Sequence, residues 1–248
     1  MRERRLHICA IGMLLAVLVV QDAAALPSGL VPFQATGDLF VLEGSTNNIL
    51  RIDQNTQAIS VAVPSAQILA ATGDSSARFV GAGMAFDSAG NLYFTTNTNI
   101  AGTEGGHLLK WNGSSVSVIA TRAAIEAVTG SSISQPVVAV GDDGFVYVAV
   151  GDSNIVKVDP STAALSLHTS RAAFQAAAGH LDVIRQSGIT PGTGGTIYVA
   201  LTGNPDSREQ LFRVNSDGTL TLLHADSPFT DLDADLTRRA DGAILTAD

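Results

Sequence analysis

The sequence predicts an all-β fold, a β-propeller of four-stranded antiparallel blades joined by short helices. The first observation is compositional, because 24 glycines among 248 residues, together with many hydroxyl and β-branched residues, favour strands and turns over long helices. The second is a strand motif that recurs about every 50 residues, a period typical of propellers and solenoids. The third is a helix-like segment that recurs between the groups of strands.

Each repeat contains four short segments with strand character. The second strand is the most regular, and in four of its five copies it follows a glycine-containing hairpin turn. Its copies are residues 38–42, 91–95, 145–149, 196–200 and 243–247. A third strand that ends in Asp or Asn is expected at 49–53, 108–112, 155–159 and 211–215, and a fourth strand follows each of these. Four antiparallel strands per repeat are typical of a propeller blade.

Three short helices are predicted between the blades, at residues 65–72, 121–129 and 170–178. Each begins at a hydroxyl residue, continues through alanines and ends before a glycine, as expected for an N-cap and a C-terminal cap. Because helices this short are unstable alone, we expect Ile68, Ile125 and Phe174 to dock them onto the sheets. The helices should lie on the face that carries the loops between second and third strands.

Residues 1–25 are predicted to be a secretory signal peptide, and residues 26–248 the propeller domain. Three arginines precede an apolar run from Ile8 to Val20, and three alanines close the segment. The run is shorter than the ~20 residues that a membrane-spanning helix needs, so no membrane span is expected in the mature chain. The product is therefore expected to be exported, to the periplasm, the cell surface or the medium. The only cysteine, Cys9, would be removed, which excludes disulfides from the mature protein.

The net charge of the chain restricts the classes of partner that it can bind. The chain carries 14 basic and 23 acidic residues and a net charge of −9, which argues against a nucleic-acid partner. Neither a nucleophile elbow nor a phosphate-binding or dinucleotide-binding glycine motif occurs, so no catalytic residue and no nucleotide cofactor is assigned.

The segment Met84–Thr96 resembles the NHL-type repeat and the related gluconolactonase and senescence-marker propellers. It has their inner strand, Asp-x-x-Gly turn and Leu-Tyr strand. The resemblance implies a propeller in which six blades are common, whereas this sequence holds four repeats and part of a fifth. We therefore expect a fragment of a longer propeller; the alternative is that C-terminal strands join N-terminal ones in a closing blade.

Asp231, Asp233 and Asp235 are a candidate metal site. They alternate with other residues, so on an extended strand their carboxylates would share one face at ~6.8 Å intervals. Clustered carboxylates are the ligands that calcium prefers, and the first strands of propeller blades line the central channel. The alternative interpretation is a solvated acidic loop.

A candidate binding face comes from the loops after the second strands. Glu43, Asn97, Asp152 and Asn204 belong to these loops, which should all open on one face. The resemblance implies that such a ring could hold a divalent metal through Glu, Asn and Asp. The comparable first-strand stretches, however, lack carboxylates and amides at the matching places. The alternative is that these residues serve only their own turns.

These observations support two functional hypotheses. The first is an exported, non-enzymatic propeller scaffold that binds a protein or glycan partner through its loop-and-helix face. The alternative is a calcium-dependent, lactonase-like hydrolase, in which a channel metal would polarise a carbonyl or activate water.

Overall fold

The structure of the chain is a computed structural model. The structure describes residues 37–75, 83–96, 106–133, 136–150, 153–179, 184–203, 209–224, 236–238 and 244–246. The predicted signal peptide lies outside these described residues. Within them, no helix has the length and apolar character needed to cross a bilayer.

The described strands form five antiparallel sheets. The first contains β1 (Leu39–Glu43), β2 (Asn48–Ile52) and β3 (Ile59–Val63). The second contains β4 (Met84–Phe86), β5 (Leu92–Thr95), β6 (Leu108–Trp111) and β7 (Val116–Ala120). The third contains β8 (Val137–Val140), β9 (Val146–Val150), β10 (Asn154–Val158) and β11 (Leu165–Thr169). The fourth contains β12 (Ile184–Pro191), β13 (Ile197–Gly203), β14 (Glu209–Val214) and β15 (Leu220–His224), and the fifth β16 (Leu236–Arg238) and β17 (Ile244–Thr246).

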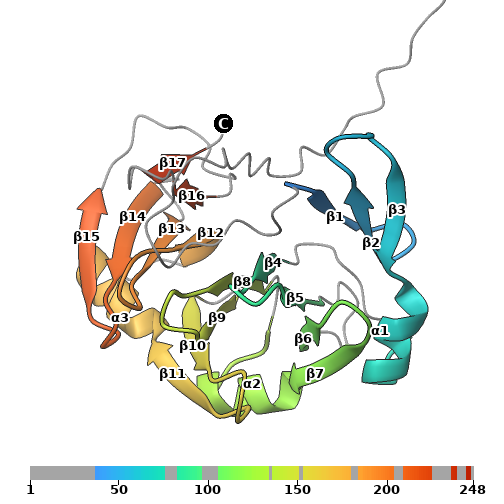
Figure 1. Cartoon of the computed structure of the whole chain (residues 1–248). Helices are drawn as coiled ribbons and strands as arrows, with labels where there is room; N and C mark the ends of the chain where they lie inside the picture. Colours follow the sequence, from blue (N-terminus) through green and yellow to red (C-terminus); the bar gives the residue numbers. More distant parts are fainter. Residues whose placement is uncertain are drawn as a thin grey trace, which may run out of the picture.

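In each of these sheets, consecutive strands are neighbours, as in the blades of a propeller. The sheets follow one another around an arc, with β4, β8, β12 and β16 toward its centre and β7, β11 and β15 at its periphery (Figure 1). The predicted all-β propeller architecture is confirmed. The β16–β17 sheet is separate from the β1–β3 sheet, and β16 contacts β12.

The hairpin turns explain why the second strands start where they do. Gly90 and Gly144 precede β5 and β9 with φ values of 83° and 80°, a left-handed conformation that glycine adopts at little cost. At the other end of the blade, the Asp53 carboxylate accepts hydrogen bonds from the N–H groups of Asn55 and Thr56. This is an Asx-type turn, as the Asp or Asn at the end of each third strand predicts.

The outer strand of every four-stranded or three-stranded sheet carries a register irregularity at the same place. The pairing shifts at Ile49/Leu50, Leu108/Leu109, Ile155/Val156 and Leu211/Phe212. Each shift leaves one extra residue on the outer strand, which is a β-bulge that bends the strand. The bend occurs near the end of the strand, where the chain leaves the sheet.

The three helices form where the sequence predicts them: α1 (Ser65–Thr72), α2 (Arg122–Thr129) and α3 (Arg171–Ala178). The Thr121 and Ser170 hydroxyls cap α2 and α3 by accepting from the N–H groups of Ala124 and Ala173. The expectation that Ser65 caps α1 is wrong, since Pro64 holds the N-cap position and no side chain caps from there. Each helix ends at a glycine in the left-handed conformation.

Among the described residues, the buried apolar side chains form three clusters, each shared by two adjacent blades. Ile68, Ile125 and Phe174 are the helix residues in these clusters, with exposures of 3%, 0% and 0%. The helices also contact the outer strand of the following blade, α1 on β7, α2 on β11 and α3 on β15. The prediction that these residues dock the helices is confirmed.

Candidate functional site

One cross-strand pair of side chains recurs at the same place in four successive blades. In each blade an aromatic residue of the second strand lies directly opposite a basic residue of the third. The pairs are Phe40–Arg51, Tyr93–Lys110, Tyr147–Lys157 and Tyr198–Arg213. Because the pair recurs in all four blades, we assign it to the construction of the blade rather than to a site.

The Tyr147–Lys157 pair shows which charged and aromatic groups these side chains contact. Lys157 Nζ lies 2.9 Å from the Asp143 carboxylate and 4.0 Å from the ring centroid of Phe145, a cation–π contact. Burial raises the pKa of the Asp143 carboxyl, but hydrogen bonds from Lys157 and Tyr147 outweigh it and the net pKa is lowered. Burial and Asp143 raise the pKa of Tyr147, which therefore stays protonated at neutral pH. This arrangement holds Asp143 and Lys157 in their charged forms. The pKa of Asp143 is lowered and that of Tyr147 is raised, so both move away from neutral pH.

A second recurring feature lies at the start of each helix. The N–H of the first helical residue donates to a side chain at the start of a strand in the preceding blade. That strand is β2 for α1, β6 for α2 and β10 for α3. Asn48 accepts from Ser65 at 2.8 Å, His107 from Arg122 at 3.3 Å and Asn154 from Arg171 at 2.9 Å. The helices therefore start beside the loops between second and third strands, on the face that the sequence predicts.

Two hollows of the helix-bearing face occupy equivalent positions in consecutive repeats. Beside α2 lies a groove of about 480 Å³ lined by Arg122, Glu126, Gly130, Ser131 and Ser132. Beside α1 lies a hollow of about 290 Å³, lined by Ser65, Ala66, Ile68, Leu69, Asp74, Ser75 and the loop residues Thr46 and Asn47. Each is bounded by the first residue of the helix, the residue four positions later and the residues that follow the terminal glycine. We call these hollows the α2 groove and the α1 groove.

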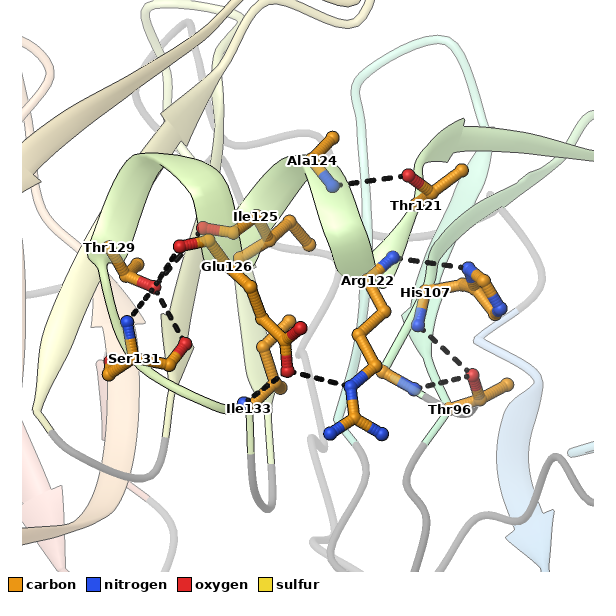
Figure 2. A network of polar contacts seen from close by, with 11 residues as sticks. Thr96, His107, Thr121, Arg122, Ala124, Ile125, Glu126, Thr129, Ser131 and Ile133 are labelled. Atoms are coloured by element: carbon orange, nitrogen blue, oxygen red, sulfur yellow. Dashed lines mark hydrogen bonds and ion pairs between the residues drawn. The ribbon is translucent and has the colours of Figure 1, made fainter. Parts of the chain in front are cut away.

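The walls of the α2 groove are fixed by hydrogen bonds (Figure 2). Arg122 Nε donates to Glu126 Oε1 at 2.7 Å, and the Ile133 N–H donates to the same oxygen at 3.2 Å. Burial raises the pKa of the Glu126 carboxyl, but these hydrogen bonds and the Arg122 charge lower it by more, so the net pKa is lowered. On the far wall, Asn154 Nδ2 donates to the Ser131 hydroxyl at 3.2 Å. The groove thus presents an ion pair and hydroxyls on a rigid frame.

The α1 groove has a different character on the same frame. Leu69 stands where α2 has Glu126, and its side chain is 45% exposed. Asn47, in the wall, has a φ of 57°, an uncommon conformation for a residue other than glycine. This groove presents an apolar side chain beside amide, hydroxyl and carboxylate groups.

Of the predicted binding-face residues, Glu43 lies among the described ones. It ends β1, and its carboxylate accepts hydrogen bonds from the hydroxyls of Ser45 and Thr46 in the loop that follows. These hydroxyls hold Glu43 within its own turn, and one of them belongs to Thr46, which lines the α1 groove. Asn97, Asp152 and Asn204 lie outside the described residues.

The predicted metal ligands Asp231, Asp233 and Asp235 also lie outside the described residues. Among the residues that the structure does describe, no three His, Asp or Glu side chains gather closely enough to hold a metal ion. Sequence reasoning missed the two grooves, although the variation between Leu69 and Glu126 at equivalent helix positions could have marked them.

Comparisons with known proteins add information on the fold alone. No protein-family model matches the chain, and no curated protein matches it. Fourteen chains of solved structures match. One of them is regucalcin, a calcium-binding protein from Agrobacterium tumefaciens strain C58, with 20% identity and a TM-score of 0.37. The match covers 58% of this chain and 42% of that protein, so the chain spans less than half of regucalcin. The propeller architecture rests on the described sheets themselves, and the regucalcin match agrees with the predicted resemblance in fold only.

Proposed function

We propose that this chain is a β-propeller binding module that holds a protein or glycan partner in the α1 and α2 grooves. The observation that carries the proposal is the contrast between the two sides of the inter-blade helices. The buried side is constant, with one large apolar residue at the same helix position in α1, α2 and α3. The groove side changes from Leu69 to Glu126 to Gln175 at one equivalent position.

This contrast is what a recognition surface on a repeat scaffold requires. Repeats are held together by their buried contacts, which tolerate little change, whereas residues that meet a partner differ from one repeat to the next. At this position the α1 groove presents an exposed apolar side chain and the α2 groove a half-buried, ion-paired carboxylate, so the two grooves offer different chemistry to a partner. The two grooves lie one blade apart, so an extended partner could occupy both.

The proposal includes export, because the predicted signal peptide would place the module in the periplasm, on the cell surface or outside the cell. A partner there would be a secreted or surface protein or a polysaccharide. Hydroxyls and an Arg–Glu pair in one open groove suit a ligand rich in hydroxyl and amide groups, which both donate and accept hydrogen bonds.

We expect Glu126→Lys to abolish or weaken partner binding by at least tenfold. The new lysine would lie one turn from Arg122 on α2, replacing an ion pair with two like charges and removing the acceptor for the Ile133 N–H. Purified protein would be screened on glycan and peptide arrays, and affinities of the hits would be measured by calorimetry.

The matched control for this variant is Asp159→Lys. Asp159 lies in the turn between β10 and β11, at the end of the blade opposite the helices, and the charge change is the same. Like Glu126 it is partly buried and accepts hydrogen bonds, in this case from the N–H and hydroxyl of Ser161. It should leave binding unchanged. Equal losses in both variants, unchanged binding by Glu126→Lys, or no ligand on either array would contradict the proposed groove.

Calcium binding through Asp231, Asp233 and Asp235 is a separate proposal, tied to the lactonase-like alternative. If the three carboxylates converge, calcium should stabilise the folded form by ~2.7 kcal/mol at a hundred times its dissociation constant. Thermal melting with calcium against chelator at fixed ionic strength would measure this, and Asp233→Asn should reduce it. Magnesium, which gives up its water shell reluctantly, should do less. A calcium shift below one degree, or one that survives Asp233→Asn, would contradict this site.

A further inference from the structure

His107 occupies a place where the neighbouring repeats use asparagine. The acceptor for the first helical N–H is the Asn48 side chain at α1, the His107 ring at α2 and the Asn154 side chain at α3. An asparagine amide does not titrate, whereas an imidazole changes its charge between about pH 5 and 8. Of the three described helices, α2 is therefore the one whose N-terminal hydrogen bond can be broken by protonation of its acceptor.

The hydrogen bond fixes which ring nitrogen carries the proton. Nδ1 accepts from the Arg122 N–H at 3.3 Å, so in the neutral ring the proton is on Nε2. His107 is 7% exposed. When the ring is protonated, both nitrogens carry protons, and the Nδ1–H faces the Arg122 N–H with no acceptor between them. The added positive charge also lies at the N-terminal end of a helix, where the helix dipole disfavours it.

The surroundings of His107 connect it to the groove (Figure 2). From the end of β5, the neutral Thr96 hydroxyl accepts from the N–H groups of Gly106 and His107 at 3.3 and 3.2 Å. From α2, the charged groups are Arg122 and Glu126, which are paired with each other. Arg122 is both the residue capped by His107 and a wall of the α2 groove. Loss of the cap therefore acts directly on a residue of the groove.

We propose that His107 is a pH-sensitive switch, whose protonation in mildly acidic solution loosens the first turn of α2 and the α2 groove but leaves α1 and α3 unchanged. The switch acts on the α2 groove and so rests on the proposed function. Its test measures amide hydrogen exchange and not ligand binding. A failure of ligand binding and a failure of the switch are thus separate results.

The test is amide hydrogen exchange by NMR, expressed as protection factors at pH 7.5 and 5.5. We expect protection of the Arg122 amide to fall roughly fivefold at the lower pH, the effect of losing one capping hydrogen bond. The Ser65 and Arg171 amides, capped by asparagine, are internal controls and should keep their protection. His107→Asn should install the cap of the other repeats and remove the pH dependence at Arg122.

The reciprocal variant Asn154→His should transfer the pH dependence to the Arg171 amide of α3. Nitrogen shifts of the His107 ring in the unmodified protein should show the proton on Nε2 at pH 7.5, and this measurement needs no variant. Constant protection at Arg122 in the unmodified protein would overturn the switch. So would the opposite ring tautomer, or a pH dependence that persists in His107→Asn.

Discussion

Replacing Phe174 with alanine is expected to lower the free energy of unfolding by about 3–5 kcal/mol. Phe174 is fully buried, and its ring contacts Phe212 of the next blade with centroids 5.3 Å apart and planes at 78°. It belongs to the cluster that joins the β8–β11 and β12–β15 sheets, so its removal leaves a cavity at a seam between two blades. Urea denaturation followed by circular dichroism would measure the loss.

The control is Leu69→Ala, which shortens an exposed leucine on α1. Since Leu69 is 45% exposed, we expect it to cost below about 1 kcal/mol. Leu69 lines the α1 groove, so the same variant also asks whether binding can be lost without loss of stability. Similar destabilisation by the two variants would mean that the helices are not docked through their buried residue.

Gly218→Ala is expected to be the most disruptive of the glycine substitutions at hairpin turns, with a loss of about 2–4 kcal/mol. Gly218 has a φ of 83°, which strains any residue with a side chain. In addition, a Cβ there would lie 2.1 Å from the carbonyl oxygen of His168 in the preceding blade. Because the clash is with backbone, the two blades must move apart at this point. That movement would break the hydrogen bond that the Thr169 hydroxyl donates to the Gly218 carbonyl at 3.0 Å.

Gly90→Ala separates strain from clash. Gly90 has the same φ of 83° in an equivalent kind of turn, but a Cβ there would meet no atom within 4 Å. It should cost about 1–2 kcal/mol, the strain alone. The difference between the two variants, measured by urea denaturation, reports the closeness of the two blades. Equal losses would show that the blades do not meet at Gly218.

The blades and the helices could be predicted from the sequence because local patterns encode them. Glycine at the hairpin turns sets the start of each second strand, and a hydroxyl start with a glycine end sets the bounds of α2 and α3. The same pattern failed at α1, since Pro64 occupies the N-cap position and Ser65 is the first helical residue. The hydroxyl there is one position too late to cap the helix.

The sequence by itself determined the repeat, the turns, the helix positions and the residues that dock the helices, because each depends on backbone preferences and on apolar periodicity within a few residues. Only the tertiary structure decided which polar residues form a surface. Arg122 and Glu126 face Ser131 because α2 packs on the next blade and Asn154 holds the far wall. Likewise, His107 became a helix cap because a bulged outer strand returns the chain to the start of the third strand. These contacts join residues of different strands and helices, so packing places them and local preference does not.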